Sequence, residues 1–111
     1  METVNGKALR LKTADYLDIV AREQKPLEVT YRGRPAESVA LIPPKLWRNG
    51  IAKAPVAQAK IQDASVRDTR ARFGDLRNSA VREGVHVRIT RNGAEHVVLV
   101  PIEWARTVLG L

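Results

Sequence analysis

The chain has 111 residues and 44% of them are apolar, enough for one compact domain or two very small ones, and this excludes wholesale disorder. It contains no cysteine, which excludes a disulfide scaffold and any thiolate metal site. Nineteen lysines and arginines against twelve aspartates and glutamates give a net charge of +7. That excess favours a polyanionic partner, nucleic acid first and an anionic membrane second.

The sequence has no recognisable membrane or export segment. No run approaches the roughly 18 consecutive apolar residues of a membrane span. The N-terminus METVNGKALRLK lacks the apolar core of a signal peptide. We therefore expect a soluble, cytoplasmic protein.

Residues 1–47 predict a first small unit. Its expected elements run strand, helix, strand, strand in chain order: 3–5, 8–21, 27–31 and 39–42. Asn5 is a residue type that caps helices. Pro43-Pro44 then precedes a short segment containing Trp47. Residues 48–60, RNGIAKAPVAQAK, are small, basic and alanine-rich, which is typical of a linker.

Residues 61–111 predict a second unit with clearer signals. A short strand at 61–64 leads to Ser65, which with Asp68 matches a helix capping box. Apolar residues recur at helical spacing over 66–81, and Gly74 predicts a kink because glycine costs about 1 kcal/mol inside a helix. The remaining expected elements are the end of that helix at Gly84, an alternating strand over 85–90, a type I′ turn at Asn92-Gly93, a strand over 97–100 that is apolar on both faces, and a helix from Pro101 to Gly110.

The two units repeat one another. A shift of 60 residues aligns 5–33 with 65–93 without a gap, and a shift of 58 then places VALIP (39–43) on VVLVP (97–101). The identical pairs are Arg10/Arg70, Asp15/Asp75, Arg22/Arg82, Glu23/Glu83, Thr30/Thr90 and Gly33/Gly93. A unit of about 45 residues buries too little surface to be stable alone. We expect an α+β fold in which two tandem βαββα repeats share one core as a pseudo-twofold intramolecular dimer.

The second copy carries an ordered set of distinctive positions: Ser65, Arg70, Phe73, Asp75-Leu76, Gly84, Ile89-Thr90-Arg91, Gly93 and Leu99-Val100-Pro101. Through these positions, residues 65–104 resemble the N-terminal domain of the Phd/YefM (prevent-host-death) antitoxins. The first copy matches more weakly, through Arg10, Val29-Thr30, Gly33 and Leu41-Ile42-Pro43.

The resemblance implies a small α/β domain that acts as a dimer, binds palindromic operator DNA and represses its own operon. It also implies DNA contact by basic residues at the start of the first helix. In that family a C-terminal tail wraps and neutralises a partner toxin. Here two copies share one chain, and the sequence ends at Leu111 soon after the last expected helix, so toxin neutralisation is a weaker expectation than DNA binding.

Two basic triplets recur at the 60-residue shift: Lys7, Arg10, Lys12 and Arg67, Arg70, Arg72. Two such clusters related by a twofold axis suit two DNA half-sites, although a solvated helix face is the alternative interpretation. We include the capping residues Asn5 and Ser65 in the candidate DNA site. Arg32 and Arg91, on or beside the hairpins with Arg34 and Arg88, either contact phosphate or discourage edge-strand aggregation.

Other residues give no sign of catalysis. Trp47 and Trp104 are expected to pack in the core or an interface, and the isolated His86 and His96 to lie at the surface without metal. No nucleophile elbow, zinc motif or glycine-rich phosphate loop is present, so no enzyme activity and no cofactor are expected. The sequence therefore predicts a DNA-binding regulator. The alternative is a protein-interaction module of a toxin–antitoxin system that binds a partner protein without reading DNA.

Overall fold

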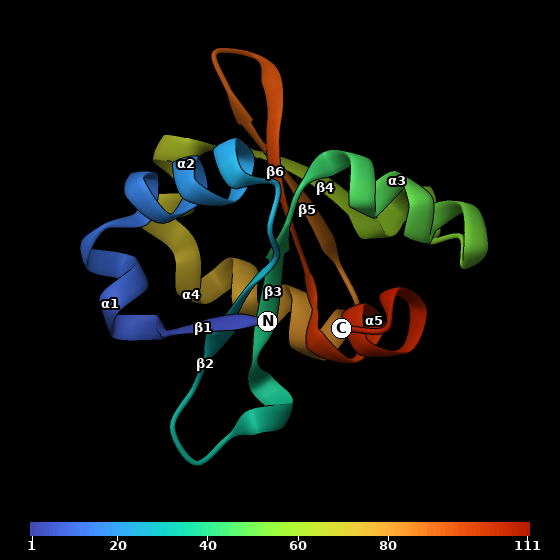
Figure 1. Ribbon diagram of the computed structural model, residues 1–111, viewed down its shortest axis with the longest axis horizontal. Coiled ribbons are helices and arrows are strands. Elements are labelled where there is room, and N and C mark those ends of the chain that lie inside the picture. Colours follow the sequence, from blue (N-terminus) through green and yellow to red (C-terminus); the bar gives the residue numbers. More distant parts are fainter.

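The computed structural model describes residues 1–111 as a mixed six-stranded sheet with five helices, which confirms the predicted α+β class (Figure 1). The strands are β1 (Glu2–Asn5), β2 (Leu27–Thr30), β3 (Val39–Ile42), β4 (Ile61–Ser65), β5 (His86–Arg91) and β6 (Ala94–Pro101). The helices are α1 (Gly6–Leu11), α2 (Thr13–Glu23), α3 (Pro44–Lys53), α4 (Val66–Glu83) and α5 (Ile102–Leu109). None of the helices is long and apolar enough to span a membrane.

The strands lie in the order β1-β2-β3-β6-β5-β4. β1 runs parallel to β2 and β4 runs parallel to β5, whereas every other neighbouring pair is antiparallel. At the centre β3 pairs with β6, and Leu41 lies opposite Leu99. The outer pairs share one register, because Val4 lies opposite Val29 and Ala64 lies opposite Ile89. We call residues 1–53 the N-terminal half and residues 61–111 the C-terminal half.

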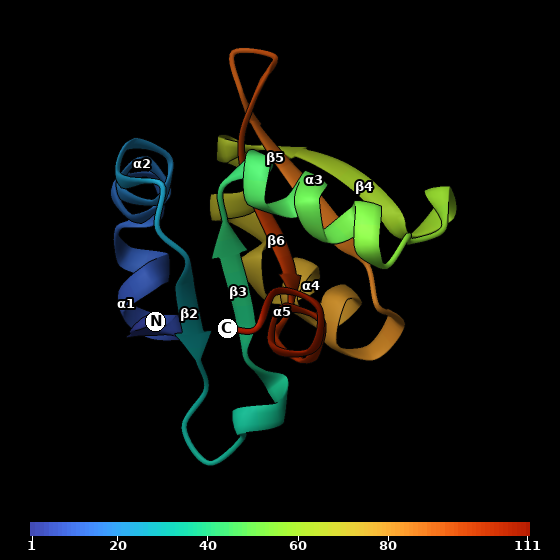
Figure 2. The same ribbon diagram turned by 45° about the vertical axis from the view of Figure 1, so that its right-hand side comes forward.

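The sheet is covered on both faces because its two central strands are apolar on both faces. A cluster of 17 buried residues joins one face to α1, α2 and α4, and a cluster of seven joins the other face to α3 and α5. Along β6, Val97 and Leu99 belong to the first cluster, whereas Val98 and Val100 belong to the second. Figure 2 shows β2 and β3 between α1 and α2 on one side and α3 on the other. Both halves therefore contribute to each core.

A helix break is present in both halves, although the sequence predicts one only near Gly74 and treats residues 8–21 as one helix. The chain leaves helical geometry at Lys12, between α1 and α2, and at Arg72 inside α4. Gly74 stays helical, and a β-carbon built on it would meet nothing within 4 Å. The kink was therefore predicted correctly, but glycine was the wrong residue to assign it to.

The local signals for caps and turns are confirmed. The Asn5 Oδ1 atom accepts a hydrogen bond from the Ala8 amide at 2.7 Å, and the Ser65 Oγ atom accepts one from the Asp68 amide at 2.9 Å. Asn92 and Gly93 have positive φ angles of 52° and 79°, as a type I′ hairpin requires. These contacts fix where α1 and α4 begin and where β5 turns into β6.

The segment expected as a linker is partly helical. Helix α3 continues to Lys53, so residues 48–53 belong to it, and only 54–60 connect the halves. Packing explains the extension: Trp47 and Gly50 are the buried residues of α3, and Gly50 lies directly against the Trp104 ring. Tertiary contact therefore holds a helix through Asn49-Gly50, residue types with low helix propensity.

The prediction that His86 lies at the surface was wrong. Its side chain is 1% exposed, and it accepts a hydrogen bond of 2.9 Å at Nδ1 from the Trp47 indole N–H. The Trp104 ring meets it edge-on with 4.6 Å between the ring centroids. Burial lowers the pKa of His86 to about 4, so the ring is neutral at physiological pH. Trp47 is also buried, which confirms its expected packing role.

Candidate nucleic-acid interface

The two basic triplets lie at the starts of α1 and α4, where the Asn5 and Ser65 caps fix the chain. Lys7 and Arg10 belong to α1 and Lys12 to the break that follows it, whereas Arg67, Arg70 and Arg72 belong to α4. All six side chains are exposed. Each triplet therefore runs from the first turn of its helix to the helix break, which is Lys12 in one half and Arg72 in the other.

The triplets meet on one surface. Arg70 of α4 and the Leu11–Asp15 segment line the same open hollow of about 220 Å³. Helices α2 and α4 also pack against each other on this face of the sheet. Lys12 from one half and Arg70 from the other therefore lie beside one hollow. We call the six cations the triplet surface: Lys7, Arg10, Lys12, Arg67, Arg70 and Arg72.

Five of the six cations of the triplet surface form no ion pair. Elsewhere in the chain eight arginines lie within 4.0 Å of a carboxylate: Arg22, Arg34, Arg48, Arg77, Arg82, Arg88, Arg91 and Arg106. Within the triplets only Arg72 lies this close to one, at 3.8 Å from Asp75. Asp15, which lines the hollow with Arg70, and Asp68 in the first turn of α4 are exposed nearby but lie beyond 4.0 Å of these cations. The five unpaired cations are therefore available to a polyanion.

The hairpin arginines do not behave alike. Arg91 is paired with Asp18 of α2, which also accepts a 3.0 Å hydrogen bond from His96. The Arg91 hydrogen bond and the His96 contact hold the pKa of Asp18 below its ordinary value. Arg88 pairs with Asp63 at 2.7 Å and Arg34 with Glu37 at 3.4 Å. Among these cations only Arg32 forms no ion pair.

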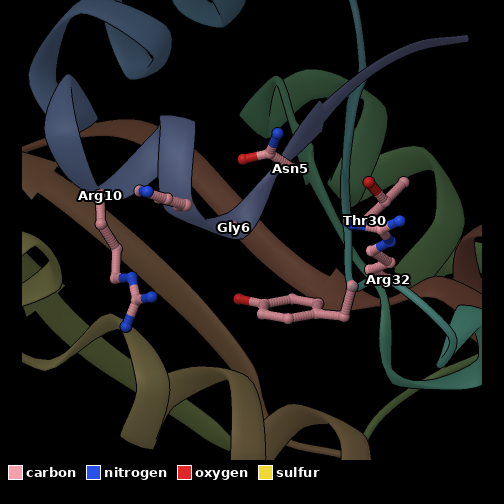
Figure 3. Close-up of a pocket in the computed structure, with 7 residues that line it drawn as sticks. Asn5, Gly6, Arg10, Thr30 and Arg32 are labelled. Carbon is pink, nitrogen blue, oxygen red and sulfur yellow. The ribbon is translucent and has the colours of Figure 1, made fainter.

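Arg32 belongs instead to a pocket of about 550 Å³ at the start of α1. Lys7, Arg10, Asn5, Thr30 and Tyr31 line it with Arg32, and no carboxylate does. Figure 3 shows Arg10 on α1 and Arg32 just past β2 on opposite sides of this pocket, with Asn5 and Gly6 above it. We call it the Gly6–Tyr31 pocket.

Sequence reasoning missed Gly6, Thr30 and Tyr31 as members of the basic site. A β-carbon on Gly6 would lie 2.7 Å from the Tyr31 ring, so the close approach of this ring to α1 requires glycine. Valine stands at the matching place of the other half, position 66. The difference between glycine at 6 and valine at 66, under the 60-residue shift, was the signal available in the sequence.

Comparisons with protein-family models, curated proteins and solved structures each found no match. No group of three or more histidine, aspartate or glutamate side chains is placed to hold a metal ion.

Proposed function

We propose that the chain is a sequence-specific regulator of transcription, of the repressor or antitoxin type, that binds an imperfect palindrome in double-stranded DNA. The observation that carries this proposal is the triplet surface, where two halves place matching cations, five of the six without an acidic partner, on one side of the sheet. Arginine can bind guanine through two hydrogen bonds, whereas lysine mainly engages phosphate. Lysines in the N-terminal triplet correspond to arginines in the C-terminal triplet, so the DNA sequences of the two half-sites should differ.

We propose further that the two halves act as a single-chain pseudo-dimer of the Phd/YefM kind. The strand order β1-β2-β3-β6-β5-β4 supports this. If β4, β5 and β6 are taken as the counterparts of β1, β2 and β3, the order is the same from either edge of the sheet. The registers support it too: Leu27 lies opposite Leu41, and Val87, sixty residues on, lies opposite Leu99. A twofold relation of this type would direct two equivalent helix starts at two half-sites.

Ion pairs between the halves favour this internal pairing over self-pairing of either half. Asp18 pairs with Arg91, and Glu37 lies 3.6 Å from Arg77 and 3.7 Å from Arg82. Each of these pairs joins a carboxylate of the N-terminal half to an arginine of the C-terminal half. Tyr31 and Asn78 stand at the places of Arg91 and Asp18, so two copies of either half would lack the pair between Asp18 and Arg91.

The test is selection of bound sequences from random duplex DNA at physiological salt, with the solution mass measured alongside. We expect an imperfect palindrome bound by one chain. Arg10→Ala and Arg70→Ala should each cost about 1–3 kcal/mol if a base is contacted. Log affinity should also fall steeply with log salt concentration.

A matched control is available on the opposite face. Lys45 and Lys53 of α3 form no ion pair, so Lys45→Ala/Lys53→Ala removes the same charge as Arg10→Ala/Arg70→Ala. We expect the control to leave the selected site nearly as tightly bound as before. Equal losses in the two double variants, or unchanged affinity in the arginine variant with the fold intact, would contradict the assignment.

A second candidate is a protein-interaction module that neutralises or binds a partner of a toxin–antitoxin system without reading DNA. Leu11 favours it, because this side chain is 76% exposed within the triplet surface and lines the hollow beside Arg70. Large exposed apolar side chains on a charged surface are common where proteins bind one another. This candidate gains support if no DNA sequence is enriched, while a neighbouring gene product co-purifies with the chain and is lost with Leu11→Ser.

A further inference from the structure

We infer that the Gly6–Tyr31 pocket binds a phosphate group. The N-terminal half has this binding site and the C-terminal half lacks it. Three cations, Lys7, Arg10 and Arg32, surround a cavity of about 550 Å³ and none of them forms an ion pair. The absence of any carboxylate from the lining leaves the positive potential uncompensated. That DNA supplies the phosphate rests on the proposed function, whereas the site itself does not.

Polar donors complete the lining. The Asn5 side chain uses its Oδ1 atom to cap Ala8, which leaves its amide N–H groups for a ligand. Burial raises the pKa of the Tyr31 hydroxyl, against the opposing charges of Arg77 and Arg10, so this hydroxyl keeps its proton and can donate it in a hydrogen bond. Cations and neutral donors without an acceptor carboxylate suit an anion that accepts several hydrogen bonds, as a phosphate does.

The Tyr31 ring is held in place from both directions. The backbone of Gly6 touches its edge, and the Arg77 guanidinium lies 4.1 Å from the ring centroid. The second contact is a cation–π interaction that joins α4 of the other half to the pocket. The C-terminal half therefore helps to hold Tyr31 in place, although every lining residue belongs to the N-terminal half.

The C-terminal half has no equivalent pocket. Val66, Arg91 and Asn92 stand at the places of Gly6, Tyr31 and Arg32. Arg91 is drawn to Asp18, and none of the four cavities in the chain is lined by Arg67 or Thr90. In the N-terminal half four of these basic side chains lack an ion pair: Lys7, Arg10, Lys12 and Arg32. At the corresponding places of the C-terminal half only Arg67 and Arg70 do, because Arg72 is paired and Asn92 is uncharged. Bound DNA would therefore be held unequally and in one orientation.

The first test uses inorganic phosphate and ¹⁵N-labelled protein, with sodium chloride at equal ionic strength as the reference. We expect phosphate to shift the amide signals of Gly6, Lys7 and Thr30 in a saturable manner, while those of Arg67 and Thr90 follow the chloride titration. Lys7→Gln/Arg32→Gln should abolish the saturable shifts. Arg67→Gln/Arg70→Gln, which removes the same charge from the other half, should preserve them.

The inference is overturned if phosphate and chloride act alike, or if both halves respond equally. Unchanged thermal unfolding of each variant shows that the fold is intact. Where Lys7→Gln/Arg32→Gln unfolds, Lys7→Gln alone is used, and it should weaken the saturable binding at least about threefold.

The second test identifies the source of the phosphate, with duplexes whose phosphates are replaced by neutral methylphosphonates in one half-site at a time. We expect one half-site to lose at least tenfold more affinity than the other, and this difference to vanish in Lys7→Gln/Arg32→Gln. Equal losses of affinity for the two modified duplexes would contradict the inference that the chain binds the two half-sites unequally. Saturable phosphate binding without any DNA binding refutes the proposed function, and supports the pocket as a site for a free phosphate compound. DNA binding without saturable phosphate binding refutes the pocket alone.

Discussion

The buried ring of His86 makes a sharp prediction about stability and pH. This side chain is 1% exposed, and the groups that hold it, the Trp47 indole N–H and the Trp104 ring, carry no charge. Protonation would place a charge among apolar rings and would abolish the hydrogen bond, because protonated Nδ1 cannot accept one. His86→Gln keeps an acceptor near Trp47 and removes the titration.

The size of the effect follows from the two pKa values of the ring. The pKa of His86 is about 4 in the folded chain, against 6.5 for a free histidine. Between these values the unfolded chain binds a proton that the folded chain does not, so stability is full above pH 6.5 and falls as the pH falls towards 4. The total loss is about 3 kcal/mol at about 1.4 kcal/mol per pKa unit, and about 2 kcal/mol of it falls between pH 7 and pH 5.

Urea unfolding at pH 7 and pH 5, followed by circular dichroism, measures this difference. We expect the wild-type chain to lose about 2 kcal/mol more than His86→Gln over the interval. His96→Gln is the control for the second histidine. It should keep the loss of unfolding free energy that His86 causes between pH 7 and pH 5. If the wild-type chain and His86→Gln lose equal stability between the two pH values, the assignment of the buried neutral ring is refuted.

Two further predictions concern packing and charge. Gly50→Ala should destabilise the fold by about 1–3 kcal/mol in thermal unfolding, since its new β-carbon would lie 2.4 Å from the Trp104 ring, whereas Gly74→Ala, with nothing within 4 Å, should be neutral or stabilising by up to about 1 kcal/mol. Asp18→Asn should cost less than about 1 kcal/mol, because the Asp18 side chain is 36% exposed. By releasing Arg91 it should also steepen the slope of log DNA affinity against log salt by up to about 0.9, and an unchanged slope would show that Arg91 stays away from phosphate.

Much of the fold could be predicted because its signals are local. Asn92-Gly93 favours a tight turn, and the Ser65 hydroxyl accepts a hydrogen bond from the amide three residues later. The apolar run over 97–100 indicates a strand whose two faces are both covered. Each of these inferences depends on residues a few positions apart, where sequence spacing and spatial distance are nearly the same.

The failures came where distant segments meet. Alternation along β5 predicts that His86 and Val87 lie on opposite faces, but it does not reveal that α3 and α5 cover the face of His86. The residue that binds its ring, Trp47, lies 39 positions away. The Gly6–Tyr31 pocket was missed for the same reason, since its lining joins residues 5–10 to residues 30–32, which lie far apart in the sequence.

The pairing of β3 with β6 has a consequence for how the chain unfolds. Each of these strands contributes side chains to both buried clusters, so the loss of either one exposes the core under α1, α2 and α4 together with the core under α3 and α5. No boundary divides the molecule into parts that retain a closed core. Melting should therefore be a single all-or-none transition, in which calorimetric and van't Hoff enthalpies agree.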